Sequence, residues 1–280
     1  MAAFLDRAPF VPISLCGAAG PLFAVHYPSA RADAGHAVLY LPPFAEEANR
    51  SRRMAALLAR KLAETGIGTM LLDPYGCGDS GGEFSEARWP VWREDGTRAV
   101  RWLRERGYQR ITLLGLRLGA LLALDTVANA DLPIDRVLLW QPVLRGDQMV
   151  TQFLRLRLAA ELAGGGRGDG TAELRRQLAA EQMVEIAGYE LHHELASAID
   201  ALRLGELGLR CRAPIDWIDV MADPAQASSP ANEQVVQRWH QANVDFRHHK
   251  VAGEPFWALQ ETTIAPGLLA LTRDLLEAGA

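Results

Sequence analysis

The chain has 280 residues, of which 49% are hydrophobic and 22% charged, which is ordinary globular usage and argues against disorder. This length fits one large domain, or a core domain that carries an insertion. The formal net charge is −5 and no basic stripe occurs, so the composition argues against nucleic acid as a partner.

Short apolar runs alternate with helical patterns along the chain, which is typical of a mostly parallel sheet covered on both faces. Two runs near the N-terminus, 11–15 and 22–27, predict an antiparallel pair, because glycine and proline between them supply a turn. Six further strands are expected, at 37–41, 69–72, 111–114, 137–140, 215–220 and 244–251.

Apolar residues with helical spacing separate these strands. One helix carries Met54, Leu58 and Leu62 on a single face. The segment 116–127 is apolar nearly all round, as expected of a helix buried beside a central strand.

The alternation stops between about residues 146 and 208, where the sequence shows helical patterns and no convincing strand. Its place after the 137–140 run predicts a helical lid, 146–208, inserted into a core formed by 1–145 and 209–280. The glycine-rich tract 164–170 within it is interpreted as a flexible surface linker.

Three scattered cysteines suit a reducing compartment better than a disulfide framework. The N-terminus lacks the basic start and long apolar run of a signal peptide. No stretch approaches the roughly 18 apolar residues that a membrane span requires. We therefore expect a cytoplasmic protein without a membrane span. The pattern leaves its oligomeric state open.

The motif Gly115-Leu116-Arg117-Leu118-Gly119 follows a predicted strand and opens an apolar helix. This context predicts the sharp nucleophile elbow of an α/β hydrolase, although an ordinary strand-to-helix turn has a similar pattern. The central residue is Arg117, and a guanidinium stays protonated, so it binds anions and pairs with carboxylates instead of attacking a substrate.

Two further loops are expected to meet the elbow at the carboxyl ends of the strands. The first, 73–82, contains Cys77 and Ser80 among glycines that allow a tight backbone path. The second, 41–53, follows the third strand, where hydrolases place the backbone donors of the oxyanion hole. It offers Glu46, Glu47, Asn49 and Arg52 for a pocket, while capping of a helix N-terminus explains the two glutamates equally well.

The loops after the last two strands normally hold the acid and the base of a catalytic triad. Asp223 matches the acid position, and we prefer this interpretation to the alternative of an Asp-Pro turn. The base position falls on Glu254 or Pro255, next to Phe256 and Trp257, and contains no histidine. His248 and His249 precede this loop and are interpreted as half-exposed strand residues. The remaining histidines do not match a zinc motif, so neither a metal nor a cofactor is expected.

With these segments in hand, the chain resembles a bacterial family, the exosortase A system-associated hydrolases, and more closely the type called hydrolase 2. The runs 42–53, 73–82, 115–119 and 255–257 carry the resemblance, and Pro-Pro-Phe-Ala-Glu-Glu at 42–47 is its most specific part. It implies an α/β-hydrolase fold in a bacterium that couples exosortase-type (PEP-CTERM) protein sorting to exopolysaccharide production. It supplies no substrate, because fold does not establish function.

Three hypotheses about function follow. In the first, the protein is a hydrolase with a degenerate catalytic triad that acts on an acyl, ester or anionic small molecule, with Glu47 as general base and Arg117 as anion anchor. Cys77 and Ser80 are candidate replacement nucleophiles.

In the second hypothesis, the protein is a non-catalytic binder of an anionic or acylated ligand. In the third, Arg117 is structural and pairs with Glu47 or Asp223, because an unpaired buried charge costs roughly 3–5 kcal/mol. Whether the protein is an enzyme stays open at this point.

Overall fold

The protein is seen in a computed structural model that describes residues 9–31, 35–129, 133–163 and 170–278. Within these residues eight strands form one sheet in the order β1-β2-β4-β3-β5-β6-β9-β10. The strands are β1 (Val11–Cys16), β2 (Pro21–Tyr27), β3 (His36–Leu41), β4 (Ile67–Leu72), β5 (Arg110–Leu116), β6 (Arg136–Trp140), β9 (Ile215–Met221) and β10 (Phe246–Ala252).

The first two strands are antiparallel to each other, and β2 is also antiparallel to β4, whereas the pairings from β4 to β10 are parallel. The expected antiparallel pair and mostly parallel sheet are thus confirmed. The chain has an α/β-hydrolase fold. Its central strands are buried on both faces, which explains why they are continuous apolar runs.

Alternate residues of each strand reach opposite faces of the sheet, where different helices cover them. Leu39 and Leu41 of β3 pack in the core that includes α2 (Trp89–Glu105), α3 (Leu118–Asn129) and α8 (Pro230–Gln241). Val38 and Tyr40 pack in the core that includes α1 (Glu46–Thr65) and α9 (Pro266–Glu277). The helix expected beside the central strand is α3, whose residues from Leu118 to Thr126 are buried.

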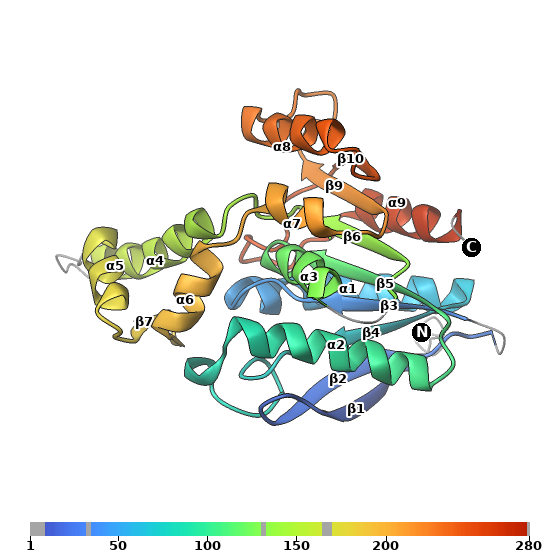
Figure 1. Cartoon of the computed structure of the whole chain (residues 1–280), viewed down its shortest axis with the longest axis horizontal. Coiled ribbons are helices and arrows are strands. Elements are labelled where there is room, and N and C mark those ends of the chain that lie inside the picture. The colour runs from blue at the N-terminus through green and yellow to red at the C-terminus, as the bar shows by residue number, and fades with distance from the viewer. Residues whose placement is uncertain (1–8, 32–34, 130–132, 164–169, 279–280) are drawn as a thin grey trace.

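The segment expected to form a lid comprises α4 (Gly146–Ala163), α5 (Thr171–Ala179), β7 (Val184–Ile186), β8 (Tyr189–Leu191), α6 (His193–Asp200) and α7 (Leu204–Arg210). Most of this segment, from α4 to α6, lies beside one end of the sheet, at the left of Figure 1, whereas α7 lies near α3. α7 packs against α3 and α8, so the predicted boundary at residue 208 falls inside a helix that contacts the core. The glycine-rich tract lies, apart from Gly170, outside the described residues.

The expectation that this segment contains no strand was wrong. β7 and β8 form an antiparallel hairpin around Ala187 and Gly188, whose φ angles are 52° and 86°. Two successive positive φ angles are the backbone of a tight two-residue hairpin turn. Each strand is only three residues long, which is too short for an alternating pattern to stand out in the sequence.

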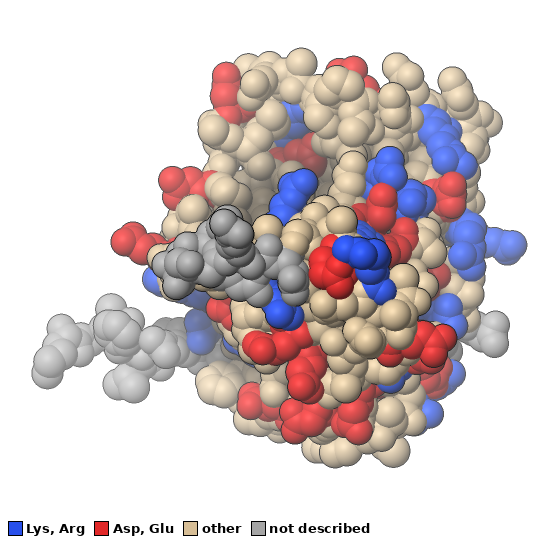
Figure 2. Space-filling view, turned by 90° about the vertical axis from the view of Figure 1, so that its left-hand side faces the viewer, with Lys and Arg blue, Asp and Glu red and all other residues tan. Residues whose placement is uncertain are grey.

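Figure 2 shows the face of the molecule on the lid side. Asp and Glu side chains gather in the lower part of this face, and basic side chains are interspersed above them. Among the helices of the described residues, none is long and apolar enough to cross a membrane.

Candidate functional site

The turn between β5 and α3 has the sharp geometry expected of the elbow. Its central residue, Arg117, has a φ angle of 56°, in the left-handed region that side chains other than glycine seldom adopt. A Cβ atom on Gly115 would lie 2.2 Å from the carbonyl oxygen of Gly119, and one on Gly119 would lie 2.3 Å from that of Leu41. The two glycines are therefore required by the close approach of backbone around Arg117.

Two other residues with positive φ follow the neighbouring strands. Ala45 follows β3 with a φ angle of 51°, and Gln141 follows β6 with a φ angle of 42°. Each such conformation costs about 1–3 kcal/mol, and strain of this kind concentrates at functional sites. Three strained residues at the carboxyl ends of three adjacent strands mark this edge of the sheet as the candidate site, as expected for open α/β sheets.

The side chain of Arg117 is held between a carboxylate and an aromatic ring. Its Nε lies 3.4 Å from Oε1 of Glu47, and only 16% and 20% of the two side chains are exposed. The guanidinium carbon lies 5.6 Å from the centre of the Trp257 ring, within the range of a cation–π contact. A carboxylate partner for Arg117 was expected, and of the two candidates the structure supplies Glu47.

Glu47 is in an unusual environment for a carboxylate. Burial raises the pKa of Glu47, and the charge and hydrogen bond of Arg117 oppose this effect without cancelling it. Its second oxygen, Oε2, is buried and has no hydrogen-bond partner among the described residues. Buried polar atoms are nearly always paired, so an orphaned carboxylate oxygen at a strained sheet edge points to a functional role.

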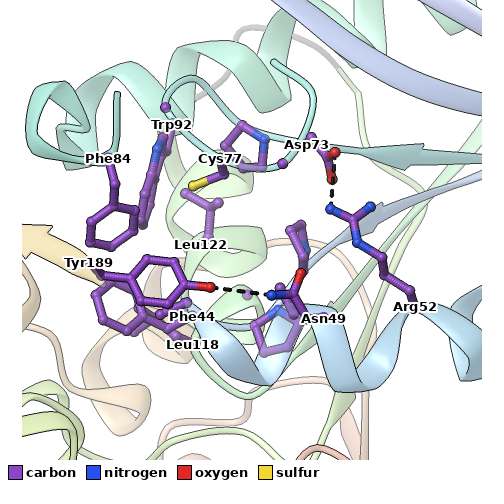
Figure 3. Close-up of a pocket in the computed structure, with 18 of the residues that line it drawn as sticks. Phe44, Asn49, Arg52, Asp73, Cys77, Phe84, Trp92, Leu118, Leu122 and Tyr189 are labelled. Atoms are coloured by element: carbon purple, nitrogen blue, oxygen red, sulfur yellow. Dashed lines mark hydrogen bonds and ion pairs between the residues drawn. The ribbon is translucent and has the colours of Figure 1, made fainter. Parts of the chain in front are cut away.

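A cavity of about 90 Å³, which we call the aromatic cavity, lies beside the elbow. Leu118 and Leu122 of α3 form one wall, and aromatic rings from four different parts of the chain form much of the rest (Figure 3). Those rings are Phe44, Phe84, Trp89, Trp92 and Tyr189. Phe44 and Phe84 meet edge to face with centroids 5.5 Å apart, and Phe84 and Tyr189 do so at 5.1 Å.

Backbone N–H groups are also available at this cavity. Phe44 and Ala45 both line it, and neither N–H has an acceptor among the described residues. Leu118 is the first residue of α3, and the first N–H groups of a helix have no partner within the helix. The residue after the elbow and the loop after β3 are where hydrolases build the oxyanion hole. Residues from both of these segments line the aromatic cavity.

Polar side chains close the aromatic cavity on two sides. At one side Arg52 Nη2 lies 3.2 Å from Asp73 Oδ2 (Figure 3). At the other, Asn49 donates to the Tyr189 hydroxyl at 3.3 Å, and that hydroxyl donates to Glu46 at 3.2 Å. These contacts join the first turns of α1 to the β7–β8 hairpin.

A second hollow, the lid-side cleft, has a volume of about 180 Å³ and shares Phe44 with the aromatic cavity. It is lined by Glu46 and Glu47 of α1, by residues of α4, and by Trp257. Glu47 thus borders the cleft between the core and α4.

The two candidate replacement nucleophiles are placed differently. Cys77 lines the aromatic cavity, and burial raises the pKa of its thiol, so the thiolate is disfavoured at neutral pH. The Ser80 hydroxyl donates to the carbonyl of Asp73 and accepts the N–H of Phe23 at 2.8 Å. Its hydrogen bonds hold the 73–82 loop against β2.

Other predicted residues lie away from Arg117. Asp223 is exposed and accepts the N–H of Ala225 at 2.9 Å, which is the hydrogen bond expected of the alternative interpretation, an Asp-Pro turn. Glu254 is exposed. Phe256 is buried in the core, with its ring centroid 6.4 Å from that of Trp140, and lines neither the aromatic cavity nor the lid-side cleft. Of Glu254, Phe256 and Trp257, it is Trp257 that lines the lid-side cleft.

Sequence reasoning missed two sets of residues. The first comprises Phe84, Trp89, Trp92 and Tyr189, whose contribution to a cavity depends on how η1 (Phe84–Glu86), α2 and the hairpin pack together. The second is a pairing of histidines with carboxylates across β9 and β10: His248 lies 2.8 Å from Asp219 and His249 2.9 Å from Asp216.

Those histidines do not restore a catalytic pair. Among the described residues, no serine or cysteine forms a hydrogen bond with a histidine. The same part of the chain contains no group of three His, Cys, Asp or Glu residues that could hold a metal ion. The chemistry available at the site is therefore that of Glu47, Arg117, Arg52 and the backbone N–H groups.

A family model described as serine aminopeptidase, S33, matches residues 36–189, which is more than half of the chain. The chain belongs to this family. The matched region runs from β3 to the β7–β8 hairpin and includes the elbow, whose central residue in this chain is Arg117. A comparison with curated proteins found none that matches.

Solved structures similar to this member of the family are α/β hydrolases. Est1E from Butyrivibrio proteoclasticus with bound ferulic acid is 14% identical, with a TM-score of 0.66 over 95% of this chain and 96% of that one. The DcsB complex with its substrate analogue is 15% identical, with a TM-score of 0.64 over 96% and 99%. A carboxyl esterase from Bacillus coagulans is 12% identical, with a TM-score of 0.62 over 96% and 98%. At these identities the likeness supports the fold alone.

Proposed function

We propose that this protein hydrolyses a small acyl or ester substrate without a Ser-His-Asp triad, with Glu47 as the general base that activates water. The observation that carries the proposal is the buried Oε2 atom of Glu47, which has no hydrogen-bond partner in the described part of the chain although Oε1 pairs with Arg117. A carboxylate whose pKa is raised by burial is a better base than one in water, because its pKa lies closer to neutral pH.

The proposed reaction needs no covalent intermediate. A water molecule attacks the carbonyl carbon of the substrate, and Glu47 accepts the proton that the water loses. The N–H groups of Leu118 and of Phe44 or Ala45 would stabilise the oxyanion that forms. The bond to the leaving oxygen then breaks, and the proton passes from Glu47 to that oxygen, which yields an acid and an alcohol.

Arg117 would be a positioning residue in this scheme. Its charge opposes the effect of burial on Glu47 and so keeps a fraction of the carboxylate ionised. Its place between Glu47 and the Trp257 ring fixes the direction of the carboxylate.

The test uses p-nitrophenyl acetate and butyrate with wild-type protein, Glu47→Gln and the matched control Glu64→Gln, at an exposed position of the same helix. A general base contributes roughly 10²–10⁴-fold, so Glu47→Gln should lower kcat at least a hundredfold while Glu64→Gln stays within a few fold. Equal turnover by wild type and Glu47→Gln would exclude Glu47 as the base. Fluorophosphonate labelling of a serine would replace the proposal with a serine mechanism.

A second function, non-catalytic binding of an anionic or acylated ligand, is favoured by a different observation. Arg52 lines the aromatic cavity, and half of its side chain is exposed. Among the described residues its guanidinium makes one hydrogen bond, to Asp73, and so keeps donors for an anion. Titration calorimetry with short carboxylates discriminates the two functions. Binding without ester turnover at high protein concentration supports the binder, and turnover by the wild type excludes it.

We also propose that the protein is cytoplasmic, carries a lid at 146–208, and works with a bacterial exosortase and exopolysaccharide system. The resemblance at residues 42–53, a run that contributes Phe44, Glu47 and Arg52 to the site, supports the exosortase association. Deletion of the gene should alter the exopolysaccharide or the sorting of exosortase substrates. An unchanged polysaccharide and unchanged sorting would contradict this association.

A further inference from the structure

A second cavity lies on the other side of the Arg52–Asp73 pair, between α1 and strands β2, β3 and β4. We call it the strand-side cavity, and its volume is about 200 Å³. Pro42, Ala48, Arg52 and Asp73 line both this cavity and the aromatic cavity. The two cavities therefore meet at the ion pair, which Figure 3 shows at one end of the aromatic cavity.

Of the two members of the ion pair, Arg52 is the more exposed and Asp73 the more firmly held. Nη2 of Arg52 makes a single contact of 3.2 Å with Asp73, and half of the Arg52 side chain is exposed, compared with 12% for Asp73. Ion pairs exposed to this extent contribute little to stability. Asp73 Oδ2 also accepts the N–H of Asp79 at 3.0 Å, which holds the carboxylate when the arginine leaves.

The backbone is shaped to admit this pair. Gly78 has a φ angle of 58°, and a Cβ atom there would lie 2.0 Å from Asp73 Oδ2 and 2.7 Å from Arg52 Nη2. Any side chain at this position would thus displace the ion pair.

Both cavities are suited to an apolar chain. The strand-side cavity is lined mainly by apolar and aromatic side chains, including Phe23, Tyr27 and Leu71. Tyr40 also lines it, and its buried hydroxyl has no hydrogen-bond partner among the described residues. The aromatic cavity alone is smaller than the roughly 150 Å³ that accommodates a benzene molecule, so it holds only a short group.

We propose that Arg52 determines the chain length of the ligand. While Arg52 pairs with Asp73, the site takes short acyl groups. Without the Arg52 side chain, an unbranched chain extends from the aromatic cavity into the strand-side cavity. This rests on the proposed function in one respect, namely that the acyl part of the ligand occupies the aromatic cavity. Arg52 is a specificity-determining residue in this proposal and takes no part in bond breaking.

The test measures binding of butanol, hexanol, octanol and decanol through the fluorescence of Trp89 and Trp92, which line the aromatic cavity. Alkanols are neutral and are not hydrolysed, so turnover does not enter the result. The variants are Arg52→Ala and its matched control Arg53→Ala, which removes the same side chain from the exposed neighbouring position on α1.

For wild type and Arg53→Ala, affinity should stop rising beyond hexanol. For Arg52→Ala it should continue to rise, to at least tenfold above wild type for decanol, because each buried methylene adds roughly fourfold. Ala56 lines the strand-side cavity, so adding Ala56→Leu to Arg52→Ala should remove the gain for decanol and leave butanol binding unchanged.

The same chain-length dependence in wild type and Arg52→Ala would overturn the proposal, and so would an absence of binding by all variants. Failure of the proposed hydrolysis is distinguished from these outcomes, because inactivity toward esters together with the expected alkanol profile leaves the role of Arg52 standing.

Discussion

Removal of Glu47 should reveal a strong energetic coupling to Arg117. At a distance of 3.4 Å the attraction between the two charges is about 5 kcal/mol for an effective dielectric constant near 20. Desolvation of both groups offsets most of this, so the net contribution of the pair to stability is small. Glu47→Ala, however, leaves a largely buried guanidinium without its carboxylate. A fully buried charge left alone costs roughly 3–5 kcal/mol, and we expect about 2 kcal/mol because part of the Arg117 side chain is exposed.

A double-mutant cycle measured by urea unfolding at pH 7 tests this expectation. Glu47→Ala and Arg117→Ala should each lower the free energy of unfolding by about 2 kcal/mol, and the double variant by about the same amount instead of about 4. Glu254→Ala, at an exposed position, should change it by less than about 0.5 kcal/mol. Additivity of the two single effects to within about 0.5 kcal/mol would refute the coupling.

The same pair predicts a pH dependence. Arg117 lowers the pKa of Glu47 against the effect of burial, so Arg117→Ala should raise that pKa further. A folded-state pKa above the unfolded value favours folding only while the group is protonated. The stability of Arg117→Ala should therefore fall as pH rises from about 4.5, by at most about 1.4 kcal/mol per pH unit, until the folded pKa is passed. A parallel dependence in wild type and Arg117→Ala would contradict this account.

Three other predictions concern the core and the site. Burial, and to a smaller extent nearby arginines, lowers the pKa of His26 and of His36 to about 4. Their NMR signals should therefore titrate near pH 4, and the free energy of unfolding should fall as pH falls from about 6.5 toward 4. Titration of these signals near pH 6.5 would contradict this. Gly119→Ala should lower the free energy of unfolding by more than about 3 kcal/mol, because the new Cβ atom meets backbone atoms. Gly170 has open space around it, so Gly170→Ala should change the free energy of unfolding by less than about 0.5 kcal/mol in the same urea assay. Cys77 should resist alkylation by iodoacetamide at pH 8 in the folded protein, because burial raises the pKa of its thiol, and should react in denaturant. Mass spectrometry measures the labelling, and rapid labelling of the folded protein would refute this.

The sequence allowed prediction of features whose causes are local. The β5–α3 turn was predictable because Gly115 and Gly119 flank a strand-to-helix junction, and the spatial order of the strands follows the usual connections of such sheets. The convergence of Glu47 and Arg117 was predictable because both follow parallel strands at the same edge.

Features that depend on packing between distant elements were beyond prediction. Tyr189 reaches the aromatic cavity only because a short hairpin packs over η1, and three-residue strands have no detectable period. Asp223 stands at the expected position in the chain, but a residue's position does not determine where its side chain points. Its carboxylate accepts the N–H of Ala225 in its own turn. Phe256 and Trp257 are adjacent and both buried, and the sequence does not say which of them contacts Arg117.

The left-handed backbone at the elbow determines where the side chain of residue 117 lies, but not which residue type stands there. Since Gly115 and Gly119 fix the turn, residue 117 projects from the same vertex whatever its type. Arg117→Ser would place a hydroxyl there, yet the loop after β10 offers Glu254 and no imidazole, so this change alone should yield no serine esterase. Re-creating one would require at least a histidine at position 254 and an acid aimed at it. The backbone geometry of the elbow and the chemistry of the side chain at position 117 are thus independent of each other in this chain.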